Sequence, residues 1–247
     1  DNCIILYGGA NRRVTPELVR RALAFYGPGD MVVLQNEVNL VDEVIDQAAD
    51  RGMQVALNPS PFDASIMDLP LDKVDYLLVN EIEATQLLKA LGAASVGGVD
   101  IEAGEAATTG ADATAGDWAA VAPALGERFR STRIVMTLGA QGAYLIDGAA
   151  CTRVPACPCK AVDTTAAGDT FTGYFLTGIA LGDSALAAMA TAARAASIAV
   201  SRPGAAASIP SADEVVAADE VVADGAGVAD EGVADSSVVD GAAERLV

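Results

Sequence analysis

The sequence predicts an α/β fold, a three-layer α/β/α sandwich with a mostly parallel central sheet. Short apolar runs alternate with longer segments of helical periodicity along most of the chain, and this order is typical of right-handed crossovers between parallel strands. The short runs are apolar throughout, which indicates strands that are buried on both faces. A chain of 247 residues can bury one sizeable core of this kind.

The first half of the chain shows the alternation most clearly. A strand at residues 4–7 precedes a helix that begins at Thr15-Pro16 and ends at Gly27, because Thr is a favoured N-cap, Pro fits the first helical position and Gly often ends a helix. The later elements are assigned on the same grounds. They are a strand at 31–34, a helix at 40–51, strands at 54–57 and 75–79, and a helix from 80 to 88.

The second half begins with a segment that has no periodicity. Residues 91–117 are rich in Gly, Ala, Thr and Asp, which predicts a long, flexible surface insertion. The chain then returns to regular elements, and its last two helices are rich in small residues that suit close packing. These elements are a helix at 118–130, a strand at 134–137 with a hairpin partner at 143–146, and helices at 168–181 and 184–200.

Residues 211–247 differ in composition from the rest of the chain. They carry ten acidic side chains and one Arg, so low complexity and high charge predict disorder, with a loose acidic helix as the alternative. We therefore expect one folded domain at 1–210 and an acidic tail at 211–247. The charge of the tail also supports a hypothesis in which it binds basic partners.

Composition excludes several classes of function. The formal net charge of −19 argues against a nucleic-acid partner, since phosphate backbones require Lys and Arg. No apolar run reaches the roughly 18 residues of a membrane span, and no signal peptide is visible, so we expect a cytoplasmic protein without a membrane partner. The sequence has no His, which removes His-based catalysis and metal binding. The spacing of its four Cys fits no zinc site and predicts reduced thiols.

A small-residue turn followed by a helix is the feature from which the chemistry is predicted. Ala166, Ala167 and Gly168 lie at the start of the helix and leave backbone NH groups uncovered at its positive end. Such an arrangement binds anions. Asp169 then serves either as a base for a hydroxyl that attacks a bound phosphoryl group or as an ordinary acidic residue of a first helical turn. The spacing alone leaves both interpretations open.

Other polar groups lie where predicted strands end. Glu37, Asn58 and the segment 80–83 each follow a strand, where parallel sheets bind ligands, although ordinary strand-end capping explains any one of them. Gly139 and Gly142 lie in a loop after a later strand, and such glycines permit close approach of a ligand or a simple tight turn. The repetition of the pattern favours a ligand site along one edge of the sheet.

The run from Asp163 to Phe171 resembles the second signature of the ribokinase family, the phosphofructokinase-B type of carbohydrate kinases. Its residues, Asp-Thr-Thr-Ala-Ala-Gly-Asp-Thr-Phe, match the family pattern Asp-Thr-x-Ala-Ala-Gly-Asp-Thr-Phe. The resemblance implies a ribokinase-like fold, with Asp169 as the catalytic base and the turn Ala166–Gly168 as the anion hole for the transferred phosphoryl group. It extends over roughly residues 3–210.

The same resemblance implies sites for the nucleotide, the sugar and two cations. Asn80 and Glu83 match an Asn-x-x-Glu motif that organises Mg²⁺ and the phosphates, and Thr137 begins a Thr-Leu-Gly-x-x-Gly nucleotide loop. The implied nucleotide-binding residues are Asn80, Glu83, Thr137, Gly139, Gly142 and Gly168. The implied sugar-binding residues are Asn11, Glu37 and Asp169. The implied residues around an activating K⁺ are Asp163, Thr165, Ala199, Arg202, Gly204 and Ser208.

The implied activity is ATP-dependent phosphorylation of D-ribose to ribose 5-phosphate, with Mg²⁺ and K⁺. Family members also carry an N-terminal portion with a sugar-binding Asp, a double-glycine signature and a β-sheet lid through which homodimers form, and this portion has no counterpart here. The chain begins without Met, which indicates a fragment or a processed form. Two alternatives stay open. One is another sugar or nucleoside kinase of the family, such as a fructokinase or a keto-deoxy sugar acid kinase, and the other is a catalytically silent, truncated nucleotide-binding homologue.

Overall fold

The structure is a computed structural model, and it describes residues 7–93, 95–96, 99–100 and 118–225. The chain divides into two compact units, Asp1–Pro210 and Ser211–Val247. The strand predicted at 4–7 falls almost wholly outside the described residues, as does most of the insertion predicted at 91–117. None of the helices in the described ranges combines the length and the apolar character that a membrane crossing requires.

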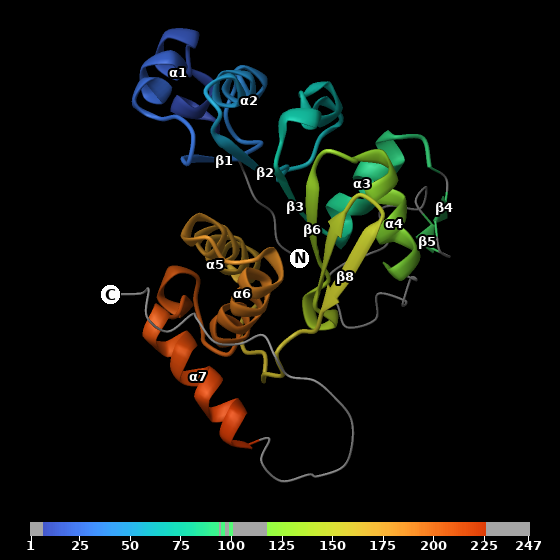
Figure 1. Cartoon of the computed structure of the whole chain (residues 1–247), viewed down its shortest axis with the longest axis vertical. Helices are drawn as coiled ribbons and strands as arrows, with labels where there is room; N and C mark the ends of the chain where they lie inside the picture. Colours follow the sequence, from blue (N-terminus) through green and yellow to red (C-terminus); the bar gives the residue numbers. More distant parts are fainter. Residues whose placement is uncertain (1–6, 94, 97–98, 101–117, 226–247) are drawn as a thin grey trace. The chain divides into compact units, whose positions relative to one another are not determined.

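The first unit is built on a six-stranded sheet with the order β1-β2-β3-β6-β7-β8 (Figure 1). The first four strands in this order are parallel, and β7 and β8 continue the sheet as an antiparallel hairpin. The structure thus confirms the mostly parallel sheet. The strands are β1 Met31–Gln35, β2 Gln54–Asn58, β3 Tyr76–Asn80, β6 Arg133–Thr137, β7 Ala143–Asp147 and β8 Ala150–Val154.

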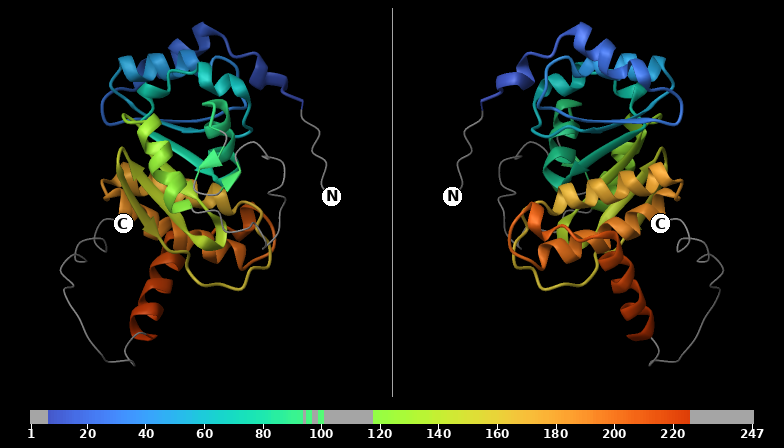
Figure 2. Two further views of the ribbon diagram at one scale, coloured as in Figure 1. Left: turned by 90° about the vertical axis from the view of Figure 1, so that its right-hand side faces the viewer. Right: turned by 90° about the vertical axis from the view of Figure 1, so that its left-hand side faces the viewer.

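Helices cover both faces of this sheet and complete the three predicted layers (Figure 1 and Figure 2). Successive strand residues point to opposite faces, so Leu77 packs with the four helices of one face and Leu78 with the two helices of the other. The first face carries α1 Pro16–Ala22, α2 Val41–Asp50, α3 Glu81–Ala90 and α4 Trp118–Arg128. The second face carries α5 Ala167–Leu181 and α6 Ala185–Val200.

Helix α5 is anchored to the sheet by an aromatic contact and to α6 by small residues. The ring of Phe175 is fully buried and meets Tyr76 of β3 edge to face, with 5.5 Å between ring centroids. Three positions further along the helix, a Cβ added at Gly178 would lie only 2.8 Å from the Cβ of Ala188. The position of α5 is therefore set by close packing against both the sheet and α6.

The predicted strands between residues 31 and 146 are all present, with ends within one residue of the prediction. Thr15 caps α1 as expected, since its hydroxyl accepts a hydrogen bond from the NH of Leu18 at 3.2 Å. The helix ends at Ala22 and continues as a 3₁₀ turn, Leu23–Phe25, so the predicted end at Gly27 was too late. Both parts of this segment still bury one apolar side chain each, Val19 and Leu23.

The structure differs from the sequence prediction in three places. Strand β8 was not predicted, because Cys151, Thr152 and Arg153 give it little apolar character. A short antiparallel pair, β4 Ser95–Val96 and β5 Val99–Asp100, lies within the segment predicted to lack structure. Helix α7, Ala212–Gly225, occupies the part of the tail described by the structure, which is the helical alternative to the predicted disorder. Residues 226–247 lie outside the described residues.

Helix α4 yields a test of the packing. Gly126 faces the β7–β8 hairpin, and an added Cβ would lie 2.0 Å from the carbonyl oxygen of Gly148. Gly126→Ala should therefore lower the free energy of unfolding by about 1–3 kcal/mol, because backbone must move to accept the methyl group. The matched control is Gly173→Ala in α5, where an added Cβ meets nothing within 4 Å, and which should be neutral or stabilising by up to about 1 kcal/mol. Urea denaturation measures both, and equal effects of the two substitutions would contradict the described contact.

Candidate functional site

The carboxyl ends of the parallel strands meet at one edge of the sheet and bring polar residues from separate segments together. Gln35 at the end of β1 pairs with Asn58 at the end of β2. Asn80 at the end of β3 pairs in the same way with Thr137 at the end of β6. This register is the reason that side chains far apart in the sequence form one continuous polar edge.

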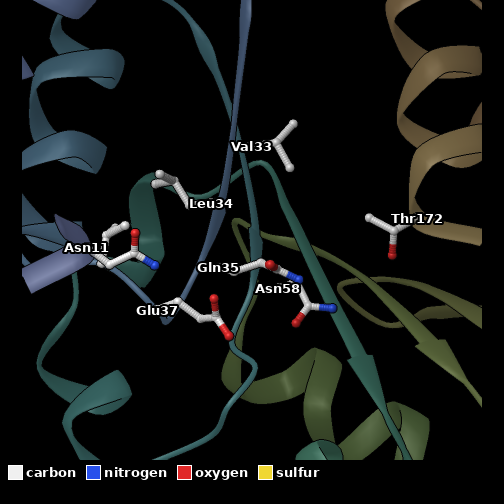
Figure 3. Close-up of a pocket in the computed structure, with 8 residues that line it drawn as sticks. Asn11, Val33, Leu34, Gln35, Glu37, Asn58 and Thr172 are labelled. Atoms are coloured by element: carbon white, nitrogen blue, oxygen red, sulfur yellow. The ribbon is translucent and has the colours of Figure 1, made fainter. Parts of the chain in front are cut away.

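A pocket of about 310 Å³ lies at the β1–β2 end of this edge (Figure 3). Two of the predicted sugar-binding residues, Asn11 and Glu37, line it together. In Figure 3 the polar ends of Gln35 and Asn58 lie beside each other, and Thr172 faces them from helix α5. The complete lining is Asn11, Val33, Leu34, Gln35, Glu37, Val38, Asn58 and Thr172.

Hydrogen bonds to Asn39 hold Asn11 at this pocket. The Asn39 side chain accepts from the NH of Val14 at 3.0 Å and donates to the Val14 carbonyl at 2.8 Å. The NH of Asn39 also donates to the Asn11 carbonyl at 3.1 Å. The segment before α1 is thereby fastened to the loop after β1, and this explains why Asn11 lies near Glu37 although the two residues are 26 positions apart in the sequence.

A second set of hydrogen bonds ties the end of β1 to the loop after β2. The NH of Asn36 donates to the Ser60 carbonyl at 3.0 Å, and its side-chain amide donates to the Pro61 carbonyl and to Asp63. Hydrogen bonds from the hydroxyl and NH of Ser65, with a smaller contribution from Asn36, lower the pKa of Asp63. The loop that follows β2 is thus tied to the end of β1 through Asn36 and the Asp63 carboxylate.

Gln35 and Thr172 were missing from the predicted site residues, and Asn58 was predicted only as a polar residue at the ligand-binding edge of the sheet, without a role of its own. Two signals in the sequence point to them. Gln35 and Asn58 occupy equivalent positions at the ends of neighbouring strands, and Thr172 follows Asp169 by three positions in a helix, where such residues share a face. Asp169 itself is exposed and is not among the residues that line the pocket.

The turn before α5 has the geometry of an anion site. Ala166 has a left-handed backbone conformation with φ of 61°, which costs about 1–2 kcal/mol for a residue with a side chain. Its carbonyl accepts from both the NH and the hydroxyl of Thr170, at 2.9 and 2.8 Å. Within the described residues, no hydrogen bond engages the NH groups of Gly168 and Asp169. These two NH groups point out of the positive end of the helix and are available to an anion.

Asn80 and Glu83 form a capping box at the start of α3. The Asn80 side chain accepts from the NH groups of Ile82 and Glu83, both at 2.9 Å, and the Glu83 carboxylate accepts from the NH of Asn80 at 3.0 Å. Glu83 is buried, with 6% of its surface exposed, and burial raises its pKa. The Asn-x-x-Glu spacing therefore has a structural role in this helix, whatever else it contributes.

The loop after β6 is a tight turn pressed against β8. Gly142 has φ of 93°, and an added Cβ would lie 2.2 Å from the Val154 carbonyl oxygen, so no other residue fits there. Arg153 donates two hydrogen bonds to the Gln141 carbonyl, at 3.2 and 2.7 Å. Gly139, with φ of 50°, has open space around it. The loop is thus held rigidly against β8 at Gly142 and Gln141, while the backbone at Gly139 is accessible to a ligand.

Hydrogen bonds link several of the residues predicted to surround a monovalent cation, which lie in the segment before α5 and at or beyond the end of α6. Asp163 accepts from the NH of Thr165 and from the NH of Gly204, each at 2.9 Å. Hydrogen bonds from the Thr165 hydroxyl, the Thr165 NH and the Gly204 NH lower the pKa of Asp163 to about 2. The NH of Arg202 donates to the Ala199 carbonyl at 3.1 Å, and Ser208 is fully buried in the same loop. A carboxylate and backbone carbonyls are hard oxygen donors of the kind that fit such a cation.

The described residues contain no group of three or more His, Cys, Asp or Glu side chains placed to hold a metal ion. A divalent ion at this edge would therefore rely on few protein ligands. Mg²⁺ is often held in this way, by one or two carboxylates together with waters and substrate phosphates. Glu83 and Asn80 lie at the correct edge of the sheet for that arrangement.

Comparisons with known proteins bear on the family and the fold of this chain. A family model described as pfkB family carbohydrate kinase matches residues 1–212. A ribokinase from Schizosaccharomyces pombe is 34% identical over 219 residues, which cover 87% of this chain and 63% of the relative. This chain therefore spans less than two thirds of the length of that curated relative.

Two solved structures share the fold. The ribokinase of Cryptococcus neoformans var. grubii serotype A in complex with ADP has a TM-score of 0.73 at 28% identity, with 88% of this chain and 68% of that chain covered. The ribokinase of Arabidopsis thaliana complexed with ribose and ATP has a TM-score of 0.64 at 26% identity, with 88% and 64% covered. The ribokinase-like fold that the sequence predicts is thus confirmed.

The hydrogen bonds of Asp163 give a pH-dependent prediction. Its pKa in the folded chain, about 2, lies below the ordinary value of 3.8, so its contribution to stability is complete above about pH 5 and is lost as the pH falls toward the folded-state pKa. The difference in urea midpoint between the wild type and Asp163→Asn should be constant from neutral pH down to about pH 5 and then shrink toward about pH 3. A difference of the same size across this range would contradict the role of the carboxylate.

Proposed function

Because the chain belongs to the pfkB family of carbohydrate kinases, we propose that it transfers the γ-phosphoryl group of ATP to a hydroxyl of D-ribose, giving ribose 5-phosphate and ADP. The choice of sugar is supported by the relative from S. pombe, which is a ribokinase, and by the A. thaliana ribokinase, whose structure holds ribose and ATP. The whole activity is a proposal for this chain, which spans 63% of the length of the first of these relatives.

One observation carries the proposal. Asn11 and Glu37 line a pocket whose opposite wall is Thr172 of helix α5, the helix that begins with the NH-rich turn and Asp169. The volume of about 310 Å³ suits a small ligand. A carboxylate, a carboxamide and a hydroxyl are the groups that recognise sugar hydroxyls by hydrogen bonding. A sugar pocket and an anion site are thus joined by one rigid helix.

Asp169 is the general base in this proposal. Its carboxylate accepts the proton of the sugar's primary hydroxyl as the hydroxyl oxygen bonds to the γ-phosphorus of ATP. The bond from that phosphorus to the bridging oxygen breaks, and the electron pair leaves with ADP. The uncovered NH groups of Gly168 and Asp169 stabilise the negative oxygens of the transferred group, and they need no rearrangement because the turn is already formed. The NH of Ala167, which was predicted to join them, instead donates to the Thr164 carbonyl at 3.3 Å.

The remaining predicted residues bind the nucleotide and cations. Asn80 and Glu83 would hold Mg²⁺, through water where their capping bonds persist, and this ion would offset the charge of the phosphates. Thr137, Gly139 and Gly142 would line the nucleotide. K⁺ would be held by Asp163, together with carbonyl and hydroxyl oxygens of the two segments that Asp163 links. This site would lie close to the anion-binding turn. The full K⁺ set is Asp163, Thr165, Ala199, Arg202, Gly204 and Ser208.

The function is tested by ADP release from ATP and Mg²⁺ with D-ribose, fructose, nucleosides and keto-deoxy sugar acids, each with and without K⁺. We expect turnover that requires D-ribose and rises with K⁺, because Asp163 and its loop support the anion-binding turn. Turnover with a different sugar alone would reassign the substrate within the family. Nucleotide binding without turnover on any of these acceptors would contradict the proposed activity and identify the chain as a nucleotide-binding homologue.

The role of the base is tested by Asp169→Asn. Loss of the proton acceptor should lower kcat by about 10²- to 10⁴-fold, while the affinity for ATP stays close to that of the wild type because the NH groups of the turn remain. The control is Asp183→Asn, an exposed carboxylate just beyond the other end of α5, which should leave kcat unchanged. A normal rate for Asp169→Asn would remove this residue from the mechanism.

A further inference from the structure

The hydroxyl of Thr172 differs from that of its neighbour in helix α5. A Thr within a helix commonly bonds its hydroxyl to the carbonyl four positions earlier. Thr170 does so, with the Ala166 carbonyl at 2.8 Å, and Thr85 of α3 does the same with Glu81 at 2.8 Å. Within the described residues, no hydrogen bond engages the hydroxyl of Thr172, although the residue is half-buried. The hydroxyl is therefore available to a ligand.

Thr172 is the residue through which α5 reaches the pocket. The other lining residues come from β1, from the loop after β1, from the last residue of β2 and from the segment before α1. Three positions separate Thr172 from Asp169, which corresponds to about 4.5 Å along the helix axis on the same face. A sugar that presents one hydroxyl to Asp169 would thus hold a second hydroxyl within reach of Thr172.

The wall across from Thr172 offers a matching polar surface (Figure 3). The carbonyl oxygen of the Asn58 side chain accepts from the NH of Ser60 at 2.9 Å, so its amide is oriented and its NH₂ group stays free to donate. Gln35 lies beside it, while Val33, 52% exposed, adds an apolar surface on the same face of β1. A sugar ring in the pocket would therefore face these amides on one side and the Thr172 hydroxyl on the other.

We propose that Thr172 determines substrate specificity, by a hydrogen bond to a ring hydroxyl of the sugar that faces α5. The contact favours a pentose that carries this hydroxyl over an analogue that lacks it. This inference rests on the proposed function, because it assumes that a sugar occupies the pocket. Helix α5 would then have two roles: Asp169 takes part in catalysis, and Thr172 helps to select the sugar.

The test combines two variants of Thr172 with D-ribose and its 2-deoxy and 3-deoxy analogues. Thr172→Val removes the hydroxyl and keeps the shape, while Thr172→Ser keeps the hydroxyl. Sugar affinity is measured by titration calorimetry, and kcat/KM for each sugar at saturating ATP. For D-ribose, Thr172→Val should weaken the affinity and lower kcat/KM by about three- to tenfold, as expected for one lost hydrogen bond. Thr172→Ser should stay near the wild type.

The deoxy sugars identify the bonded hydroxyl. For the analogue that lacks it, the wild type and Thr172→Val should bind equally, because the interaction is already absent. For the other analogue, Thr172→Val should lower the affinity and kcat/KM as much as it does for D-ribose. The KM for ATP should not change in either variant. If Thr172 had only a structural role, Thr172→Val would instead weaken the affinity for all three sugars equally and would lower the urea midpoint.

Thr177→Val is the matched control, because Thr177 is an exposed Thr on the same helix that does not line the pocket. It should behave as the wild type with every sugar. If the wild type binds sugars and Thr172→Val binds them equally well, the inference is wrong and the proposed function stands. If the wild type binds none of the sugars, the proposed function fails and the inference fails with it.

Discussion

Parallel pairing of β1, β2, β3 and β6 is the constraint on which the candidate site depends. It brings the residues that follow four separate strands to one edge of the sheet, with Gln35 beside Asn58 and Asn80 beside Thr137. Helices bury both faces of these strands, so a shift of one residue in register would move apolar side chains out of the core. The geometry of the site is therefore fixed by the same packing that stabilises the fold.

Helix α5 connects the parts of this edge. Its buried face is held by the contact between Phe175 and Tyr76, and Ala166, the residue just before its first turn, has a left-handed backbone conformation. The loop that leads into α5 is also held in place, because the Asp163 carboxylate accepts a hydrogen bond from the NH of Gly204, beyond the end of α6. The uncovered NH groups of Gly168 and Asp169, the exposed Asp169 side chain and the pocket residue Thr172 thus belong to one element that packing and hydrogen bonds hold in place. Such preformed groups suit catalysis, since little reorganisation is needed when the substrate binds.

Asn80 and Glu83 show how a structural role and a proposed functional role share residues. The capping box satisfies NH groups at the start of α3 and keeps a buried carboxylate at the edge of the sheet. The loop after β6 behaves similarly, because Gly142 is required by the close approach of β8 while Gly139 stays open. From the sequence alone, such residues could be interpreted either as structural caps and turns or as ligand-binding residues. In the structure, the same residues can have both roles.

The sequence alone determined the order of strands and helices, the parallel sheet and the location of its polar edge, because apolar periodicity and capping residues are local signals. It also located the turn before α5 and the residues Asn11 and Glu37 that prove to share a pocket. It missed β8, whose polar residues form a strand only because β7 offers an edge. Only the tertiary structure showed that Thr172 faces Gln35 and Asn58 and that Asp163 joins two distant loops. These contacts join segments that lie far apart in the chain, and they exist only once the packing of α5 and α6 against the sheet has fixed the distance between them.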